Sequence, residues 1–231
     1  MEDVKRLKRG EPLAYVIGWA DFLGVKIDLR YKPLIPRPET EFWTERAIAH
    51  IKSKSTNGYE CNESVKCLDV FAGSGCIGIA VLKHVSQARM DFADISPKAL
   101  KQIKFNLKLN KIKAGRYQIK HSHILENVRM SYDYIFANPP YIPLPRKKRL
   151  SKSVVAYEPH AALFAGKDGL WYIRRFLEEA KNHLKPGGEI WLEFDSGQKA
   201  VIEQLAKEYG WRKFKIFKDQ FGRFRYAVML R

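Results

Sequence analysis

Short apolar runs alternate with amphipathic stretches along the chain from residue 65 onward. The runs predict seven strands, over residues 65–71, 89–94, 116–121, 132–137, 189–194, 211–217 and 224–230. Apolar residues at helical spacing predict helices between them, over residues 76–85, 97–110, 170–184 and 197–209. Strands that alternate with helices form a mainly parallel sheet, so the pattern predicts a doubly wound α/β fold.

Two of these boundaries carry specific end signals. Ser96 is a good N-cap and Pro97 suits the first helical position, so a helix is predicted to begin there. Farther along, the residues Lys185-Pro186-Gly187-Gly188 are predicted to end a helix before the strand at 189–194.

The start of the chain follows a different pattern. A basic segment runs to Gly10, and apolar runs at Ala14–Ile17 and Phe22–Leu29 predict two short strands. We expect these strands to form a β-hairpin appendage to the main fold. Pro38 and the carboxylates after it then predict a helix that ends near Lys52.

A domain boundary is predicted between these elements and the sheet. Residues 55–64 are mostly polar, which indicates a solvated connector. The chain is therefore expected to divide into residues 1–54, with the basic segment, the hairpin and the helix after it, and a main α/β domain over residues 65–231.

The composition fits a protein with one folded core. Of the 231 residues, 45% are hydrophobic, which is enough to bury one α/β core. No apolar run approaches the roughly 20 residues that cross a bilayer, and the first residues lack a signal-peptide core, so we expect a cytoplasmic protein. Cys61, Cys67 and Cys76 show no C-x-x-C spacing, which predicts neither disulfides nor a thiolate metal site.

The chain is strongly basic. Its 42 Lys and Arg residues against 25 Asp and Glu give a formal net charge of +17, which attracts RNA, DNA, ribosomal particles or acidic proteins. One basic cluster comprises residues 146–149 with Lys152, and Lys101, Lys104, Lys108 and Lys111 line one side of a predicted helix. A solvated loop and a solvated helix face are the alternative interpretation of both groups.

A glycine-rich loop follows the first strand of the main domain. Gly73, Gly75 and Gly78 form G-x-G-x-x-G, which lets the backbone turn tightly and approach an anionic ligand at a helix start. Asp94 lies 21 residues after Gly73, where a carboxylate can accept hydrogen bonds from both ribose hydroxyls of an adenosine cofactor. Asp69 is predicted to orient the loop from a buried position and to help bind the cofactor. The pattern fits S-adenosylmethionine and a nicotinamide dinucleotide equally.

The residues Asn138-Pro139-Pro140-Tyr141 directly follow the fourth strand, at the edge where open α/β sheets bind ligands. Two prolines remove backbone donors and stiffen the turn, so the carbonyls of Asn138 and Pro139 stay available as acceptors. A planar NH2 group can donate to the Asn138 side-chain oxygen and to the Pro139 carbonyl, while Tyr141 packs on its face. These residues predict methyl transfer to a planar amide nitrogen, and a plain strand-ending turn is the alternative.

In this combination the chain resembles the PrmC/HemK family, the protein N5-glutamine methyltransferases that modify the Gly-Gly-Gln motif of peptide chain release factors. The matching blocks are Glu11–Gly18, Leu34–Glu41, the glycine loop, Asp94, Asn138–Tyr141, Tyr157–Pro159, Leu163, Lys167–Leu170, Leu192–Phe194, Asp219, Gly222 and Arg225. The resemblance implies a class I, Rossmann-like fold, S-adenosylmethionine as cofactor and a release factor as protein substrate.

The resemblance also places the family's site on particular residues. It assigns cofactor binding to Phe71, Ala72, Gly73, Ser74, Gly75, Asp94, Ile95, His123, Ile124 and Asn138. Arg37 and Glu39 would frame the substrate pocket beside the turn at 138–141, or stabilise a helix start through their charge. His121 and His123 have no further clear metal partner in the sequence, so no metal is predicted.

The sequence departs from the family in three places. Phe71-Ala72 stand where the family commonly has glycine and threonine, and Ser122-His123-Ile124 stand where it often has Ser-Asp-Trp. Only residues 1–10 precede the match, whereas relatives usually carry a helical N-terminal domain, so a short form is implied. The open alternatives are methylation of an exocyclic amino group of RNA or DNA, methylation of a ribosomal-protein glutamine, a nicotinamide oxidoreductase, and an RNA-binding module that keeps the fold.

Overall fold

A twisted sheet forms the centre of the structure. The computed structural model describes residues 2–56 and 64–231, and within these ranges the large sheet has seven strands in the order β5-β4-β3-β6-β7-β9-β8. The strands are β3 (Val65–Val70), β4 (Ala88–Asp94), β5 (Tyr117–His121), β6 (Tyr132–Ala137), β7 (Leu184–Glu193), β8 (Lys213–Lys218) and β9 (Phe224–Leu230). β9 runs antiparallel to both β7 and β8, and the other neighbouring strands of this sheet run parallel to one another. The predicted α/β fold with seven strands is confirmed.

The strand order reverses next to β3. β4 and β5 lie on one side of β3, whereas β6 and β7 lie on the other. The loops that follow β3 and β6 leave the sheet side by side, because Val70 pairs with Ala137 at the ends of the two strands. Open α/β sheets bind ligands at such a reversal of strand order. The topology therefore brings the glycine loop and the Asn-Pro-Pro-Tyr turn together.

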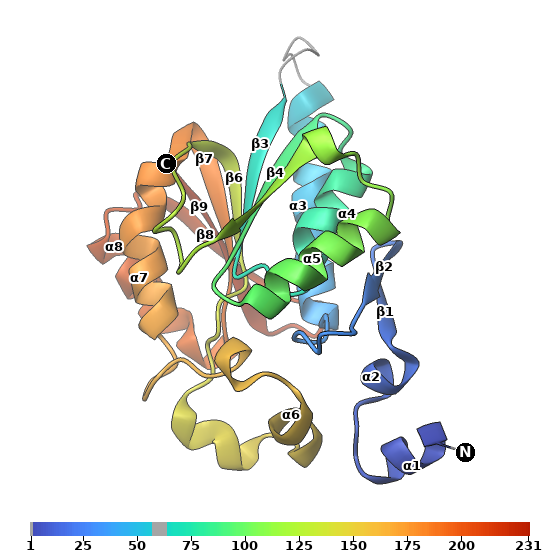
Figure 1. Cartoon of the computed structure of the whole chain (residues 1–231). Helices are drawn as coiled ribbons and strands as arrows, with labels where there is room; N and C mark the ends of the chain where they lie inside the picture. Colours follow the sequence, from blue (N-terminus) through green and yellow to red (C-terminus); the bar gives the residue numbers. More distant parts are fainter. Residues whose placement is uncertain (1, 57–63) are drawn as a thin grey trace.

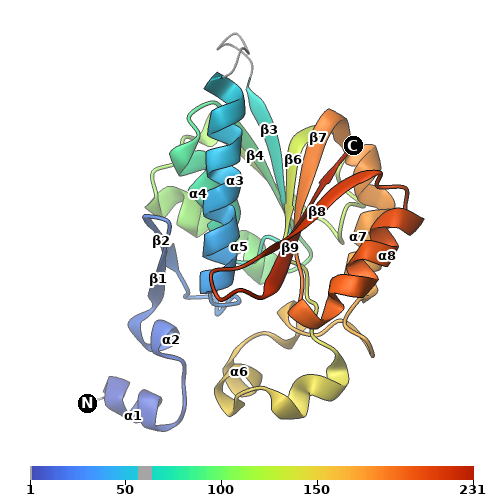
Figure 2. The same cartoon turned by 180° about the vertical axis from the view of Figure 1, so that it is seen from behind.

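Helices cover both faces of the sheet (Figures 1 and 2). One face carries α3 (Pro38–Thr56), α4 (Cys76–His84) and α5 (Pro97–Leu109), and the other carries α7 (Trp171–Ala180) and α8 (Lys199–Glu208). Two clusters of buried apolar side chains fill the two layers. Ser96 caps α5 as predicted, with its Oγ accepting a hydrogen bond from the Ala99 N–H at 3.4 Å. Every helix within the described ranges is too short or too polar to cross a membrane.

The elements before α3 differ in part from the prediction. Residues expected as the first hairpin strand form the short helix α2 (Leu13–Ile17), and the hairpin comprises β1 (Trp19–Phe22) and β2 (Val25–Asp28). The prediction of a strand at 14–17 was wrong because a short apolar run fits either element. Pro12 precedes the helix, and Gly18, with a left-handed φ of 87°, ends it by donating its N–H to the Ala14 carbonyl. The basic segment contains a further helix, α1 (Glu2–Lys8).

The boundary near residue 188 was also predicted wrongly. α7 ends at Ala180, a 3-10 turn spans Lys181–His183, and β7 already begins at Leu184, which pairs with Tyr132. The Lys-Pro-Gly-Gly segment therefore lies inside the strand instead of ending the helix. The register shifts opposite this segment, and Gly187 has a φ of 75°, so the extra residues are accommodated as an irregularity of the ladder.

The elements before residue 57 pack directly on the sheet layer. Ile27 of β2 and Trp43 of α3 are fully buried in the same apolar cluster as β3, α4 and β4. The hairpin is also tied to α5, because the Asp28 N–H donates to Asn106 Oδ1 at 2.9 Å. Residues 57–63, most of the expected connector, lie outside the described residues. The division into two domains at that point remains a prediction.

A segment between β6 and α7 crosses the carboxyl end of the sheet. It contains the 3-10 helix η2 (Leu144–Arg149), the helix α6 (Lys152–Tyr157) and the 3-10 helix η3 (His160–Ala162). This segment lies at the same end of the molecule as α1 and α2 (Figures 1 and 2). The Tyr157 hydroxyl donates to the Arg9 carbonyl at 3.1 Å, which links the two groups of helices.

Candidate active site

The glycine loop after β3 forms the floor of a cavity. Gly73 and Gly75 have positive φ values of 54° and 78°, a conformation that favours glycine. Gly78 serves packing, because a Cβ there would lie 2.3 Å from the Phe92 ring of β4. The three glycines therefore turn the loop and seat α4 against the sheet, which leaves backbone amides near the start of α4 facing the cavity end of the sheet.

Asp69 supports this loop from below. Its side chain is fully buried, its Oδ2 accepts the Gly78 N–H at 3.0 Å, and its Oδ1 has no hydrogen-bond partner among the described residues. Burial raises the pKa of Asp69 well above its usual value. Asp69 does not line the cavity. Its contacts are those of a loop-orienting residue, and its contribution to cofactor binding remains a prediction.

Asp94 joins the two loops on the cofactor side of the cavity. Its Oδ2 accepts the Gly73 N–H at 2.9 Å and its Oδ1 accepts the Ser96 N–H at 2.8 Å. Burial raises the pKa of Asp94, while these two hydrogen bonds oppose the shift. The carboxylate lines the cavity at the end of β4, and each of its oxygens keeps acceptor capacity for a ribose hydroxyl.

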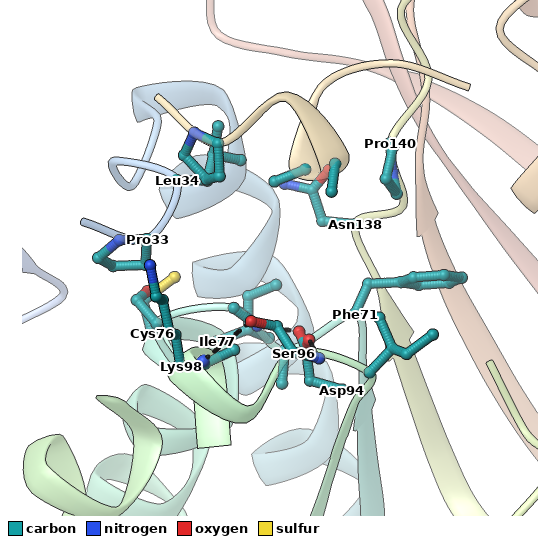
Figure 3. Close-up of a pocket in the computed structure, with 18 of the residues that line it drawn as sticks. Pro33, Leu34, Phe71, Cys76, Ile77, Asp94, Ser96, Lys98, Asn138 and Pro140 are labelled. Carbon is teal, nitrogen blue, oxygen red and sulfur yellow. Dashed lines mark hydrogen bonds between the residues drawn. The ribbon is translucent and has the colours of Figure 1, made fainter. Parts of the chain in front are cut away.

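Asn138 faces Asp94 across the cavity. Figure 3 shows Asn138 and Pro140 on one side and Asp94 with Ser96 on the other. The Asn138 amide Nδ2 donates to Thr40 Oγ1 at 3.2 Å. Among the hydrogen bonds of residues 2–56 and 64–231, none occupies the Asn138 side-chain oxygen. The turn therefore has an unused acceptor beside the cavity, and its predicted contact with a substrate NH2 group remains a prediction.

The other two residues of the turn are held inside the protein. Pro139 is buried, and neither Pro139 nor Tyr141 lines the cavity. The Tyr141 hydroxyl donates to Glu193 Oε1 at 3.0 Å, and its ring packs against the apolar cluster on the α7 side. Burial raises the pKa of Tyr141 well above its usual value. Contact of Pro139 and Tyr141 with a substrate remains a prediction.

Arg37 and Glu158 shape the mouth of the cavity. Arg37 Nη2 lies 2.6 Å from Glu158 Oε1, and the Ile35 N–H donates to Glu158 Oε2 at 3.2 Å. This pair ties the segment before α3 to the end of α6. Arg37 lines the cavity, whereas Glu39 lies in the first turn of α3 away from it, where its charge favours the helix start.

Aromatic side chains form the wall beside the loop. Phe71 packs edge-on against Tyr172, with ring centroids 5.7 Å apart, and His123 lies 6.4 Å from the same ring. His123 Nδ1 also lies 3.0 Å from Glu126 Oε1. Tyr172 lines the cavity but was missed in the sequence, because its helical spacing marks α7 only as a packing element.

The cavity brings most of the predicted site residues together. It has a volume of about 380 Å³, within the usual range for small-ligand sites. Its walls include these predicted residues: Arg37, Phe71, Ala72, Gly73, Ser74, Asp94, Ile95, His123, Ile124, Asn138 and Pro140. Gly75 does not line it but forms the N-cap of α4. These features fit S-adenosylmethionine, which the glycine loop, the start of α4 and the Asp94 carboxylate would bind.

No metal centre is evident in the part of the chain that the structure describes, since no three His, Cys, Asp or Glu side chains there lie close enough to hold an ion. Cys67 and Cys76 are free and buried, while Cys61 lies outside the described residues. Thr40 and Glu193 were missed as site residues, although both stand in blocks that carry the family resemblance. Their role depends on contacts between distant segments.

A glycine loop, an acidic residue at the end of β4 and an Asn-Pro-Pro-Tyr turn at the strand reversal define a class I S-adenosylmethionine-dependent methyltransferase. The family "Methyltransferase small domain" matches residues 55–156. The release factor glutamine methyltransferase of Streptococcus pneumoniae is 36% identical over 232 residues, which cover 99% of this chain and 78% of that protein. The protein of the same name from Lactococcus lactis is 33% identical, with 95% and 77% covered. The chain belongs to the release factor glutamine methyltransferase family.

Solved structures agree with this class. A methyltransferase from Pyrococcus furiosus superposes with a TM-score of 0.62 over 99% of this chain and 97% of its own, at 17% identity. This likeness shows the fold, and it confirms the predicted class I architecture. The predicted cofactor, S-adenosylmethionine, follows from membership of the family. The nicotinamide oxidoreductase and the non-enzymatic RNA-binding module are thereby set aside.

Proposed function

We propose that this chain methylates the N5 amide nitrogen of the glutamine in the Gly-Gly-Gln motif of peptide chain release factors. The observation that carries the proposal is the Asn138 side chain, whose unused oxygen stands beside a cavity floored by the cofactor loop. The names of the relatives in Streptococcus pneumoniae and Lactococcus lactis support the same substrate.

A glutamine side chain suits two acceptors, the Asn138 side-chain oxygen and the Pro139 carbonyl. Its NH2 group donates two hydrogen bonds in one plane, so the Asn138 oxygen and the Pro139 carbonyl together would fix the orientation of the nitrogen. The nitrogen lone pair is delocalised into the carbonyl and attacks weakly. Positioning in a site that excludes water must therefore supply much of the rate, and no strong base is required beside the nitrogen.

S-adenosylmethionine, when bound, supplies a methyl group activated on a sulfonium sulfur. The acceptor nitrogen gains that methyl group and loses one proton to water, while S-adenosylhomocysteine remains as the second product. Asp94 lies across the cavity from Asn138 (Figure 3), and the loop residues Gly73 and Ser74 also line the cavity. The two walls would hold donor and acceptor at a fixed mutual distance, which converts the transfer into an effectively unimolecular step.

The basic surface near the mouth suits work beside RNA. Lys147, Lys148, Arg149 and Lys152 are exposed on η2 and α6, whereas Arg146 is paired with Asp195 at 2.9 Å. We propose that these exposed cations attract the phosphates of ribosomal RNA while a release factor is engaged, and that the enzyme works in the cytoplasm. The same charge keeps methylation of an RNA amino group as the second candidate function.

The test is transfer of a labelled methyl group. Purified protein is incubated with methyl-labelled S-adenosylmethionine and, separately, with release factor and with bulk RNA, and the label is located by mass spectrometry. We expect label on the Gly-Gly-Gln glutamine, and we expect Asn138→Ala to lower the rate at least about hundredfold because it removes the positioning acceptor.

The matched control is Asn182→Ala. Asn182 is exposed in the 3-10 turn before β7, at the end of the sheet away from the cavity, so this variant should keep wild-type activity. Label on RNA alone would move the assignment to a nucleic-acid methyltransferase. Label on another glutamine, with Gly-Gly-Gln untouched, would point to a different protein substrate such as a ribosomal protein.

A further inference from the structure

A buried carboxylate lies directly behind the Asn138 amide. Glu193 ends β7 and is 1% exposed. Its Oε2 accepts hydrogen bonds from Thr40 Oγ1 and Trp43 Nε1, both at 2.7 Å, and its Oε1 accepts one from the Tyr141 hydroxyl at 3.0 Å. Glu193 is thus an acceptor for three donors, two from α3 and one from the Asn-Pro-Pro-Tyr turn.

This arrangement sets the direction of the next hydrogen bond. The Thr40 hydroxyl has one proton, and it donates that proton to Glu193. Toward Asn138 the Thr40 oxygen can therefore act only as an acceptor, and it accepts the Asn138 Nδ2–H at 3.2 Å. The amide oxygen of Asn138 is then left without a partner among the described residues, and Asn138 lines the cavity.

The reversed orientation of the Asn138 amide is disfavoured, because the Thr40 hydroxyl proton is already donated to Glu193. Turning the Asn138 amide by 180° would place its oxygen against the Thr40 oxygen with no proton between them. It would also present an NH2 group to the cavity, where it would oppose the NH2 group of an incoming glutamine. The orientation that Glu193 imposes is the one that an amide acceptor needs.

Positive charge behind the carboxylate strengthens the arrangement. Arg225 of β9 is buried, and its Nε donates to Asp219 Oδ2 at 3.2 Å. Burial raises the pKa of Glu193, while its three hydrogen bonds and the charge of Arg225 oppose the shift. An indole N–H can only donate, so Glu193 Oε2, which receives both the Trp43 N–H and the Thr40 hydroxyl, is an acceptor oxygen of the carboxyl group. With Glu193 as the acceptor, the direction of the hydrogen bond between Thr40 and Asn138 is fixed as well.

We propose that Thr40 and Glu193 are positioning residues, which orient the Asn138 amide so that its oxygen accepts a hydrogen bond from the substrate NH2 group. The proposal deepens the proposed function and rests on it, since the required orientation follows from an NH2 substrate. Neither residue takes part in the transfer itself. Thr40 acts through its hydroxyl, and Glu193 acts through Thr40.

The test compares Thr40→Val with Thr40→Ser. Valine keeps the shape and removes both hydrogen bonds, so the Asn138 amide is free to turn. We expect kcat for the Gly-Gly-Gln substrate to fall about tenfold to hundredfold, with less than about a twofold change in the S-adenosylmethionine Kd. Serine keeps the hydroxyl and should restore most of the rate. Equal losses in both variants would overturn the proposal, because the hydroxyl would then not be the active feature.

A second measurement separates positioning from a structural role. In the Asn138→Ala background, Thr40→Val should cost little further activity, because the side chain through which Thr40 acts is gone. A full additional loss there would contradict the proposal. If Thr40→Val fails to fold, side-chain amide NMR of the wild-type protein decides: the Asn138 NH2 should show one proton protected by the Thr40 hydrogen bond, and two equally exchanging protons would overturn the proposal.

The two proposals fail in distinguishable ways. Absence of methyl transfer by the wild-type enzyme to any Gly-Gly-Gln substrate would end the proposed function. The NMR measurement of the Asn138 NH2 protons does not depend on that result, because it requires only the folded protein.

Discussion

Asp94 shows how one side chain organises the cofactor side of the cavity. Both of its oxygens accept backbone N–H groups, one from Gly73 in the glycine loop and one from Ser96 at the start of α5. The carboxylate therefore fixes the spacing between the loop and the next helix. It does so while keeping lone pairs free for a ligand on the cavity side.

We expect Asp94→Asn to raise the Kd for S-adenosylmethionine about tenfold to hundredfold, the effect of losing one hydrogen bond to a charged group. Whichever way the asparagine turns, its NH2 group faces a backbone N–H, so one of the two loops must move. Isothermal titration calorimetry would measure the change. Asp3→Asn, an exposed carboxylate on α1, is the control, and an unchanged Kd in the Asp94 variant would place the ribose elsewhere.

Phe71 shows what the sequence could not predict at this scale. It stands where the family commonly has glycine, yet its φ of 59° is left-handed, a conformation that costs a non-glycine residue about 1–2 kcal/mol. Its ring packs against Tyr172 and Phe176 of α7, with centroids 5.7 Å and 6.2 Å away. The loop keeps the glycine-like backbone because a helix far along the chain stabilises the ring.

At the scale of elements, periodic patterns were reliable and short runs were not. The strands β3 to β6 and the helix α5 begin and end within a residue or two of their predicted bounds. The residues of α2 were predicted as a strand, because five residues are too few to distinguish the two periods. Local patterns also gave the loop and the Asn-Pro-Pro-Tyr turn, whereas Glu193 meets Thr40 across 153 residues, and only the fold shows that contact.

The anchoring of α1 gives an element-scale prediction with a pH dependence. Arg6 of α1 bonds both oxygens of Glu11 at 2.9 Å and donates to the Tyr15 carbonyl of α2. The hydrogen bonds from Arg6 lower the pKa of Glu11 from 4.5 to about 2. Because the folded-state pKa is lowered, this anchoring is fully present above about pH 4.5 and is lost as the pH falls through about 2.

NMR titration of the Glu11 carboxyl carbon would measure this pKa directly. Glu11→Gln removes the carboxylate at every pH, so we expect faster amide exchange in residues 2–9 of the variant at neutral pH, with the sheet unaffected. An ordinary Glu11 pKa, or unchanged exchange in α1, would mean that the Arg6–Glu11 pair does not anchor the helix.

At the scale of the whole molecule, residues 15–51 and the sheet share one apolar layer. Trp43 of α3 is fully buried, and its ring lies 6.4 Å from both Phe136 of β6 and Tyr226 of β9. The same indole donates to Glu193 at the edge of the active site. A residue on the N-terminal side of the expected connector is therefore part of the packing that supports the catalytic turn.

This packing predicts that the chain unfolds as one cooperative unit despite the boundary expected at residues 55–64. Trp43→Ala should lower the free energy of unfolding by about 3–5 kcal/mol, because it leaves a large cavity between α3 and the sheet. Hydrogen exchange in increasing denaturant would follow residues 15–51 and β3 to β7 separately. In the wild type and the variant, both groups should lose protection at the same denaturant concentration, shifted equally by the substitution. If residues 15–51 open first while the sheet keeps its protection, the chain consists of two units, and the core that they share contributes little to the stability of either.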